Sequence, residues 1–423
     1  MIRRHSLIND LLTLRGNPRA CVYTEPLWGI PFNLYVGYTS VYMSALGLSD
    51  GDIGMLATIG LVFQFFFAIF GGVITDRFGR RLTTLIFDIF AWAVPALFSA
   101  IAQNYWYFLA AAIINGVWRI THTSWYCLLV EDAERDQLVT IFTWISIANL
   151  IVGLISPLTG ELIKMFSLIP TVRGLYFFAA VMFTIKAVAT YLMTTETAQG
   201  KIRMLETRDQ HLGSLLIGQF SVFREILRTP QTLYTGGIML VFAIYNLISG
   251  SFWGIIVTKK MLFPEDAISQ FQFVRAAVMI LFFFVIMPRL SKLHFKLPMT
   301  GGFLLFFVSQ VLLINVPEKN YLLLGLSVFL EACSWATVNP LIERMTVLTI
   351  DAKERARILS ILYLGIILFT APFGWLAGNL STINKDLPFV LIMGLFVIGA
   401  LLAYMAGRSS EKNQPAPEQG QAV

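Results

Sequence analysis

Two segments of the sequence place polar and titratable residues at the spacing of one helical face. The first combines an amide, a guanidinium, an imidazole and a phenol: Asn115, Arg119, His122 and Tyr126. The second combines two carboxylates with an indole and an amide: Glu331, Trp335, Asn339 and Glu343. A carboxylate can take up and release a proton, an imidazole changes charge near neutral pH, and an arginine can bind an anionic group or lower the pKa of a nearby carboxyl. The two faces therefore predict proton transfer and the binding of a polar ligand.

The segments that carry these residues belong to long apolar runs. Hydrophobic residues make up 57% of the 423 residues and charged residues 13%, whereas soluble domains carry about 25% charged residues. The mean hydropathy of +0.71 also indicates a chain whose outer surface faces lipid. A membrane-crossing helix needs about 20 apolar residues. We expect twelve such helices, at about 27–47, 53–75, 82–102, 105–130, 138–163, 172–195, 231–258, 266–288, 298–316, 321–345, 355–378 and 387–406.

The distribution of basic residues predicts the orientation of the chain in the membrane. Most of the 31 lysine and arginine residues fall in the terminal segments and in alternate connections. The other connections hold only Lys164, Arg173, Lys259, Lys260, Lys319 and Lys385. Because cytoplasmic loops are enriched in these residues, both termini are expected on the cytoplasmic side of the plasma membrane. The first residues lack the features of a signal peptide, so the first span is expected to direct insertion.

The chain is expected to divide into two related halves of six helices. DAERDQLVTIF begins at Asp132 and DAKERARILSI begins at Asp351, and each follows a predicted span. Such internal similarity indicates a duplicated unit. The connection between the halves is polar first and then amphipathic, as expected of a helix on the membrane surface. The predicted order is a cytoplasmic segment, a bundle, a cytoplasmic linker, a second bundle and a disordered tail: 1–26, 27–195, 196–230, 231–407 and 408–423.

After the second predicted span the chain reads GGVITDRFGRR, from Gly71 to Arg81. Gly72 can let another backbone approach closely, and Asp76 can meet the N-terminus of another helix. Gly79 permits a tight turn. The arginines, which can pair with acidic groups, are Arg77, Arg80 and Arg81. The spacing predicts a structured loop at the membrane edge.

This loop resembles motif A of the major facilitator superfamily, and the resemblance covers residues 25–407. It implies an all-α membrane protein of two pseudo-symmetric six-helix bundles that rock about a central site. It also implies that Asp76 meets the start of helix eleven, and that the arginines pair with an acidic residue after helix four, for which Glu131 and Asp132 are the candidates. The second copy of the motif is reduced here to MPRLSKLHF.

The resemblance further implies that helices one, four, seven and ten line the central cavity. The polar and aromatic residues expected there are Asn33, Tyr38, Asn115, Tyr126, Tyr245, Asn246, Trp253, Trp335 and Asn339. Charged groups inside spans are costly and mark functional sites. We expect Glu331 to couple proton movement, Arg119 to bind substrate or adjust the pKa of Glu331, and His122 to assist. A static ion pair is the alternative for the two charged residues. For Asp88 and Lys186 a structural pairing is expected, whereas the side chain of Arg275 could extend outward to the membrane surface.

The resulting hypothesis is a secondary active transporter, not an enzyme, that exports a small organic or amphipathic compound in exchange for protons. GLISPLTG, from Gly153 to Gly160, resembles an exporter motif of the family. Uptake of a small organic anion, lipid translocation, and a non-transporting sensor or membrane enzyme are the alternatives. Nucleotide-binding, metal-binding and nucleophile motifs are absent from the sequence, so neither a cofactor nor a metal is expected. The expected partners are the solute, protons and the lipid bilayer, without nucleic acid, and the chain is expected to be a monomer.

Overall fold

The computed structural model describes residues 14–133, 141–142, 144–145, 151–208, 230–290, 295–349 and 355–413. Every regular element in these ranges is a helix, which confirms the all-α class. Nine helices in the described part of the chain are long and apolar enough to cross a membrane. The number twelve stays a prediction, because three of the expected spans are not single long helices.

The first half contains the helices α2 (Gly16–Tyr35), η1 (Val36–Tyr38), α3 (Thr39–Ala45), α4 (Asp50–Phe78), α5 (Arg80–Asp88), η2 (Ile89–Ala93), α6 (Val94–Ala100), α7 (Tyr105–Asn115), α8 (Trp118–Val130), α10 (Pro157–Phe166) and α11 (Leu168–Met193). The second half contains α15 (Pro230–Ile255), η4 (Ile256–Lys260), α16 (Ala267–Val285), α17 (Met287–Leu290), α18 (Lys296–Ile314), α19 (Tyr321–Thr349), α20 (Arg355–Ile383) and α21 (Leu387–Asn413).

Local interruptions divide two of the three expected spans that are not single long helices, and the third lies partly outside the described residues. The first, 27–47, is formed by α2, η1 and α3, and α2 already begins at Gly16 and continues through two prolines. The fourth, 105–130, is divided between α7 and α8 at Gly116 and Val117. A Cβ atom at Gly116 would lie 2.9 Å from the Cβ of Phe63 on α4, so this turn lets α4 approach. The fifth, 138–163, lies partly outside the described residues.

The linker and the tail differ from the sequence expectations in extent. A short helix, α12 (Ala198–Thr207), follows α11 and packs against α4. The amphipathic segment of the linker lies outside the described residues, as do the repeated segments at 134–140 and 351–354. Helix α21 continues to Asn413, so it includes the first residues of the tail that was expected to be disordered.

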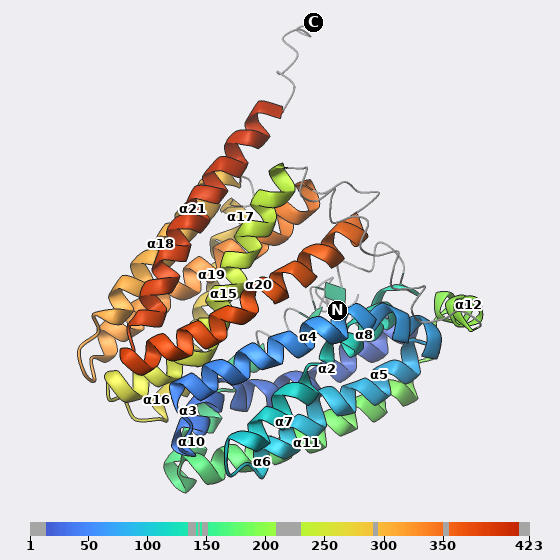
Figure 1. The fold of residues 1–423 in the computed structure, drawn as a ribbon, viewed down its shortest axis with the longest axis horizontal. Helices are drawn as coiled ribbons and strands as arrows, with labels where there is room; N and C mark the ends of the chain where they lie inside the picture. Colours follow the sequence, from blue (N-terminus) through green and yellow to red (C-terminus); the bar gives the residue numbers. More distant parts are fainter. Residues whose placement is uncertain are drawn as a thin grey trace, which may run out of the picture.

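The two halves diverge from a shared end (Figure 1). Helices α3, α10 and α16 gather at this end, from which the first half extends to the right in the figure and the second half extends upward. We call it the Asp50 end, because α4 begins there at Asp50, and we call the opposite end of α4 the Asp76 end. A single hydrophobic cluster runs through both halves.

Close backbone packing joins α4 to α20 at the Asp50 end. A Cβ atom on Gly54 would lie 2.3 Å from the carbonyl oxygen of Gly374 and 2.8 Å from the Cα of Gly378. The absence of side chains here lets the two helices touch along their backbones. The Nζ of Lys385 lies 2.6 Å from a carboxylate oxygen of Asp50, which adds a partly buried ion pair beside the glycines.

A second contact between the halves joins α10 to α16, also at the Asp50 end. The hydroxyl of Ser156 donates to the carbonyl of Ser269 at 3.1 Å, and the backbone N–H of Ser269 donates to the hydroxyl of Tyr38 at 3.1 Å. A Cβ atom on Gly160 would meet the Ser269 hydroxyl at 2.3 Å, so glycine is required for this approach. The other hydrogen bonds and ion pairs that join described residues of the two halves, such as those of Thr58 with Ala371 and Trp375, also lie toward the Asp50 end.

Candidate functional site

Glu331 lies at the centre of a buried polar cluster in the second half. Its carboxylate accepts a hydrogen bond from the Tyr245 hydroxyl at 2.5 Å and one from Ser249 at 3.3 Å. The guanidinium of Arg275 lies 2.6 Å from the other carboxylate oxygen. The carboxylate side chain is 4% exposed, and the guanidinium also lies over the ring of Trp253. Three helices, α15, α16 and α19, thus converge on one carboxylate.

Arg119 lies in the first half and is not the ion-pair partner of Glu331. Its guanidinium stacks on Trp118 at 4.0 Å and donates to the Gln64 side chain at 3.4 Å. His122 follows one turn later on α8, where its ring lies against Trp118 and Tyr126. The structure therefore places Arg275, which was expected to extend outward to the membrane surface, beside the carboxylate that was expected to respond to Arg119.

The other expected cavity residues fall into two groups. Tyr38, Tyr245 and Trp253 are buried and take part in packing or in the contacts already described. The partly or fully exposed ones are Asn33, Asn115, Tyr126, Asn246, Trp335 and Asn339. The amide of Asn115 donates to the carbonyl of Ala91 at 2.8 Å, so its side chain also holds α7 against η2. The indole of Trp335 donates to Asn246 at 3.4 Å within the second half.

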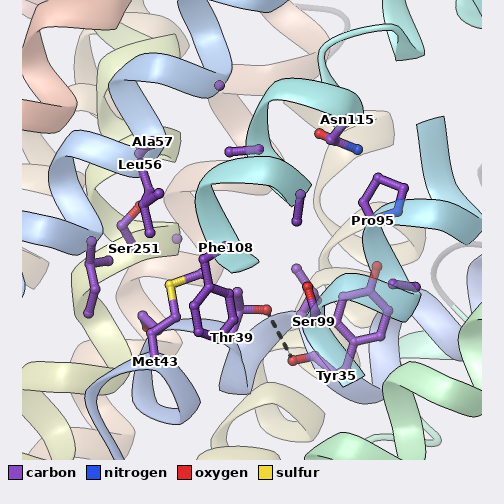
Figure 2. A pocket seen from close by; sticks show the side chains of 18 of the residues that line it. Tyr35, Thr39, Met43, Leu56, Ala57, Pro95, Ser99, Phe108, Asn115 and Ser251 are labelled. Carbon is purple, nitrogen blue, oxygen red and sulfur yellow. Dashed lines mark hydrogen bonds between the residues drawn. The ribbon is translucent and has the colours of Figure 1, made fainter. Parts of the chain in front are cut away.

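A cavity of about 370 Å³ lies mainly in the first half and reaches α15 of the second (Figure 2). Its wall is largely apolar, with Met43, Leu56 and Phe108 in the view of Figure 2. Polar groups are few, and the hydroxyl of Thr39 forms a 2.9 Å hydrogen bond with Tyr176. Such a wall suits a ligand with a sizeable apolar surface and a few polar groups.

The loop at the Asp76 end forms a network of ion pairs with the first half and with α12 of the linker. The two carboxylate oxygens of Asp76 lie 3.1 Å from Arg80 and 2.9 Å from Arg203 of α12. Arg80 also pairs with Glu131 at 3.0 Å. The hydrogen bond from Arg203 to Asp76 raises the pKa of the Arg203 guanidinium, so the contact favours its charged form. In the described conformation Asp76 is thus held by α12.

Further carboxylates complete this network. Glu196 accepts hydrogen bonds from the backbone N–H groups of Arg80 at 2.9 Å and Arg81 at 3.0 Å, at the start of α5. Gly79 has φ +83° and precedes this helix, which explains the need for glycine. Asp132, the second acidic candidate, instead accepts from the Asn17 amide at 2.9 Å. Arg77 has no hydrogen bond or ion pair with a described residue.

The close backbone approach expected at Gly72 occurs at Gly71 instead. A Cβ atom on Gly71 would lie 3.4 Å from the carbonyl oxygen of Arg119 on α8, whereas one on Gly72 would meet no described atom within 4 Å. Adjacent helical residues point about 100° apart, so only one of the two glycines can face α8. No described atom approaches Gly72 closely in this conformation, so a close approach at Gly72 in another arrangement stays a prediction.

A second buried ion pair lies in the first half, together with an acid that the sequence analysis missed. Lys186 lies 2.5 Å from Asp88, which also accepts a 2.8 Å hydrogen bond from Thr121. Glu25 of α2 is 8% exposed and lies near this pair. It was assigned to the segment before the first span. The run from Ala20 to Leu48 contains Glu25 as its one charged residue, and this signal could have placed it inside the membrane.

Replacing Lys186 with methionine is expected to lower the free energy of unfolding by about 3–5 kcal/mol, because it leaves Asp88 buried without its cation. The double variant Lys186→Met/Asp88→Asn should recover most of that loss. Unfolding midpoints in detergent would measure both, with the exposed Lys201→Met as the control. Equal midpoints for the single and double variants would contradict a stabilising pair.

Comparisons with known proteins agree with this architecture. A family model described as Major Facilitator Superfamily matches residues 29–292. Among solved structures, that of a mutant of the nucleoside transporter NupG has a TM-score of 0.71 at 16% identity, covering 92% of this chain and 99% of that chain. A POT family transporter in complex with 5-aminolevulinic acid has a TM-score of 0.70 at 15% identity, covering 92% and 96%. Among curated proteins, no sequence matches the chain.

Proposed function

Because the chain belongs to the Major Facilitator Superfamily, we propose that it is a secondary active transporter that moves a small solute across a membrane by alternating access. The observation that carries this proposal is the unequal contact between the halves. The glycines of α4 and α20 and the Asp50–Lys385 ion pair join them at the Asp50 end. At the Asp76 end the ion pairs of Asp76 and Arg80 join residues of the first half and of α12, and none of them reaches a described residue of the second half.

Alternating access requires a second arrangement in which the two halves are in contact at the Asp76 end and separated at the Asp50 end. Glycine contacts suit such a change, because backbones that touch without interlocking side chains can separate with little repacking. Asp76, now held by Arg203, could then contact the other half, as the resemblance to motif A implies. The residues at 350–354, where that contact is expected, lie outside the described part of the chain.

Proton coupling is proposed to reside at Glu331. The ionised carboxylate suits the ion pair with Arg275, whereas a protonated one would release the guanidinium. Protonation of Glu331 would therefore change the contacts that Arg275 and Tyr245 make with this carboxyl group in the second half. A change of charge at a buried site where three helices meet is a physical means of linking protons to helix movement.

Export is proposed as the direction, across the plasma membrane, by a monomer with both termini in the cytoplasm. The segment from Gly153 to Gly160 supports it, because both glycines pack closely against α16: Cβ atoms there would lie 2.9 Å from Ala276 and 2.3 Å from Ser269. Small residues at this contact seal the two halves against leakage. Uptake of an organic anion is the second candidate, and Arg119 favours it because no described carboxylate pairs with this arginine.

The experiment that tests the function uses the purified full-length chain. A thermal-shift screen against amino acids, sugars, organic acids and antimicrobials, at two pH values, would identify a solute. That solute is then supplied to proteoliposomes that contain a pH-sensitive dye. We expect movement of the solute against its gradient when a pH difference is imposed, with a matching change of internal pH. Solute binding without any flux would instead support a sensor.

A further inference from the structure

A second cavity, of about 360 Å³, lies within the first half among α2, η2, α8 and α11. Four tryptophans form much of its wall: Trp28, Trp92, Trp118 and Trp125. Three of them are in ring contact in series, with centroids 5.1 Å apart for Trp28 and Trp92 and 6.2 Å apart for Trp92 and Trp118. We call this space the tryptophan cavity. It shares Phe32 and Trp92 with the larger cavity of Figure 2.

The charged groups that line the tryptophan cavity leave one carboxylate without a partner. Lys186 is engaged by Asp88 at 2.5 Å. Glu25 has no hydrogen bond or ion pair with any described residue, although it is only 8% exposed. With His122 neutral, the wall therefore carries one more negative than positive formal charge. A buried carboxylate without a partner is costly, so it either holds a proton or awaits a cation.

Two indole groups in the same wall also lack partners. The Nε1–H groups of Trp28 and Trp125 are buried and donate to no described atom. Buried donors of this kind are nearly always satisfied in native proteins, by a protein group, a water or a ligand. The faces of indole rings attract cations, whereas their N–H groups require an acceptor. The cavity thus presents cation-attracting faces, a carboxylate and two free donors.

We propose that the tryptophan cavity binds an organic ammonium compound that also carries a hydrogen-bond acceptor, with Glu25 as its counter-ion. The inference rests on the proposed transport function and names the class of its solute. Among the positive groups nearby, Lys186 pairs with Asp88 and lies over the ring of Trp125, and Arg119 stacks on Trp118 without lining the cavity. No described cation lies over Trp28 or Trp92, so these two indole rings can receive the ammonium group. It also weakens the case for an anion, because Glu25 adds a carboxylate to the wall of this cavity.

The test is equilibrium binding to the purified full-length chain in detergent. (3-Methoxyphenyl)trimethylammonium, whose methoxy oxygen is a hydrogen-bond acceptor, is the cationic probe, and benzenesulfonate is an anionic probe of similar size, each followed by quenching of tryptophan fluorescence. We expect saturable binding of the cation and no comparable binding of the anion. Glu25→Gln should weaken cation binding about tenfold or more, because it removes the counter-charge. Glu161→Gln, which changes an exposed glutamate of α10, should leave it unchanged.

Several results would overturn the proposal. These are an absence of saturable cation binding, equal or tighter binding of benzenesulfonate, or unaltered cation affinity in Glu25→Gln. If that variant fails to fold, Trp28→Leu takes its place, since it removes an indole that no described cation covers and should also weaken binding; unchanged affinity would then contradict the proposal. None of these measurements involves a gradient. Flux in proteoliposomes can therefore succeed when the cation proposal fails, and cation binding can persist in a chain that does not transport.

Discussion

Glu331→Gln is expected to reduce proton-driven solute accumulation to the level of protein-free liposomes while solute exchange continues. Glutamine has nearly the shape of glutamate and can still accept the hydrogen bond from Tyr245, but it cannot take up or release a proton. It also leaves Arg275 permanently without its counter-charge. The variant should therefore move solute down its own gradient without coupling that movement to protons.

Two assays on the same proteoliposomes distinguish coupling from general damage. One imposes a pH difference and follows accumulation, and the other follows exchange of labelled for unlabelled solute at equal pH. Glu318→Gln is the control, because Glu318 is an exposed glutamate in the turn before the same helix, α19, and lies off the polar face that carries Glu331. Retained accumulation in Glu331→Gln would refute the coupling role. Loss of exchange as well would show that the variant is simply inactive.

Gly54→Ala is expected to slow transport roughly tenfold by preventing closure of the Asp50 end. The new methyl group would lie 2.3 Å from the carbonyl oxygen of Gly374, so α4 and α20 must separate. Overpacking of this kind costs about 1–3 kcal/mol. Because it affects only the arrangement in which the Asp50 end is closed, the cost shifts the population toward the opposite arrangement.

The shift can be measured as a distance between spin labels on the two halves. Labels at Ala45 and Ile383, both exposed near the Asp50 end, should move apart in Gly54→Ala, in a background without native cysteines. Gly365→Ala is the control on α20, because a Cβ atom there meets no described atom within 4 Å. An unchanged distance distribution together with normal transport would rule out the proposed role of the glycine contact.

The sequence predicted the features that depend on composition along the chain. The apolar runs indicated helices, and the spacing in GGVITDRFGRR indicated a structured loop at the end of α4. These signals are local, because a membrane helix needs only length and hydropathy to be recognised. Even so, Pro26 and Glu25 obscured the beginning of the first span, since a charge followed by a proline ordinarily ends an apolar helix.

Partnerships between distant residues could not be predicted in the same way. Arg119 and Glu331 were considered together because both lie near the middle of their spans, yet Arg275 of α16 is the residue that contacts Glu331. The choice depends on how each helix is rotated about its axis and on which neighbour it meets, and hydropathy reports neither. The same limit explains why the sequence did not indicate Gly71 as the glycine that faces α8, since one residue changes the direction of a side chain by about 100°.

The contact between Asp76 and α12 has a consequence for the segment that joins the halves. In a rocking mechanism the Asp76 carboxylate has two rival partners: Arg203 in the arrangement described here, and the other half when the Asp76 end closes. The connecting segment is then a competitor for the carboxylate as well as a tether. Partly exposed ion pairs contribute up to about 1 kcal/mol, enough to change a two-state ratio about fivefold. Cutting the chain after α12 would remove the covalent connection between the halves but leave this competition for Asp76 intact. The equilibrium between the two proposed arrangements would then depend partly on a helix that lies outside both bundles.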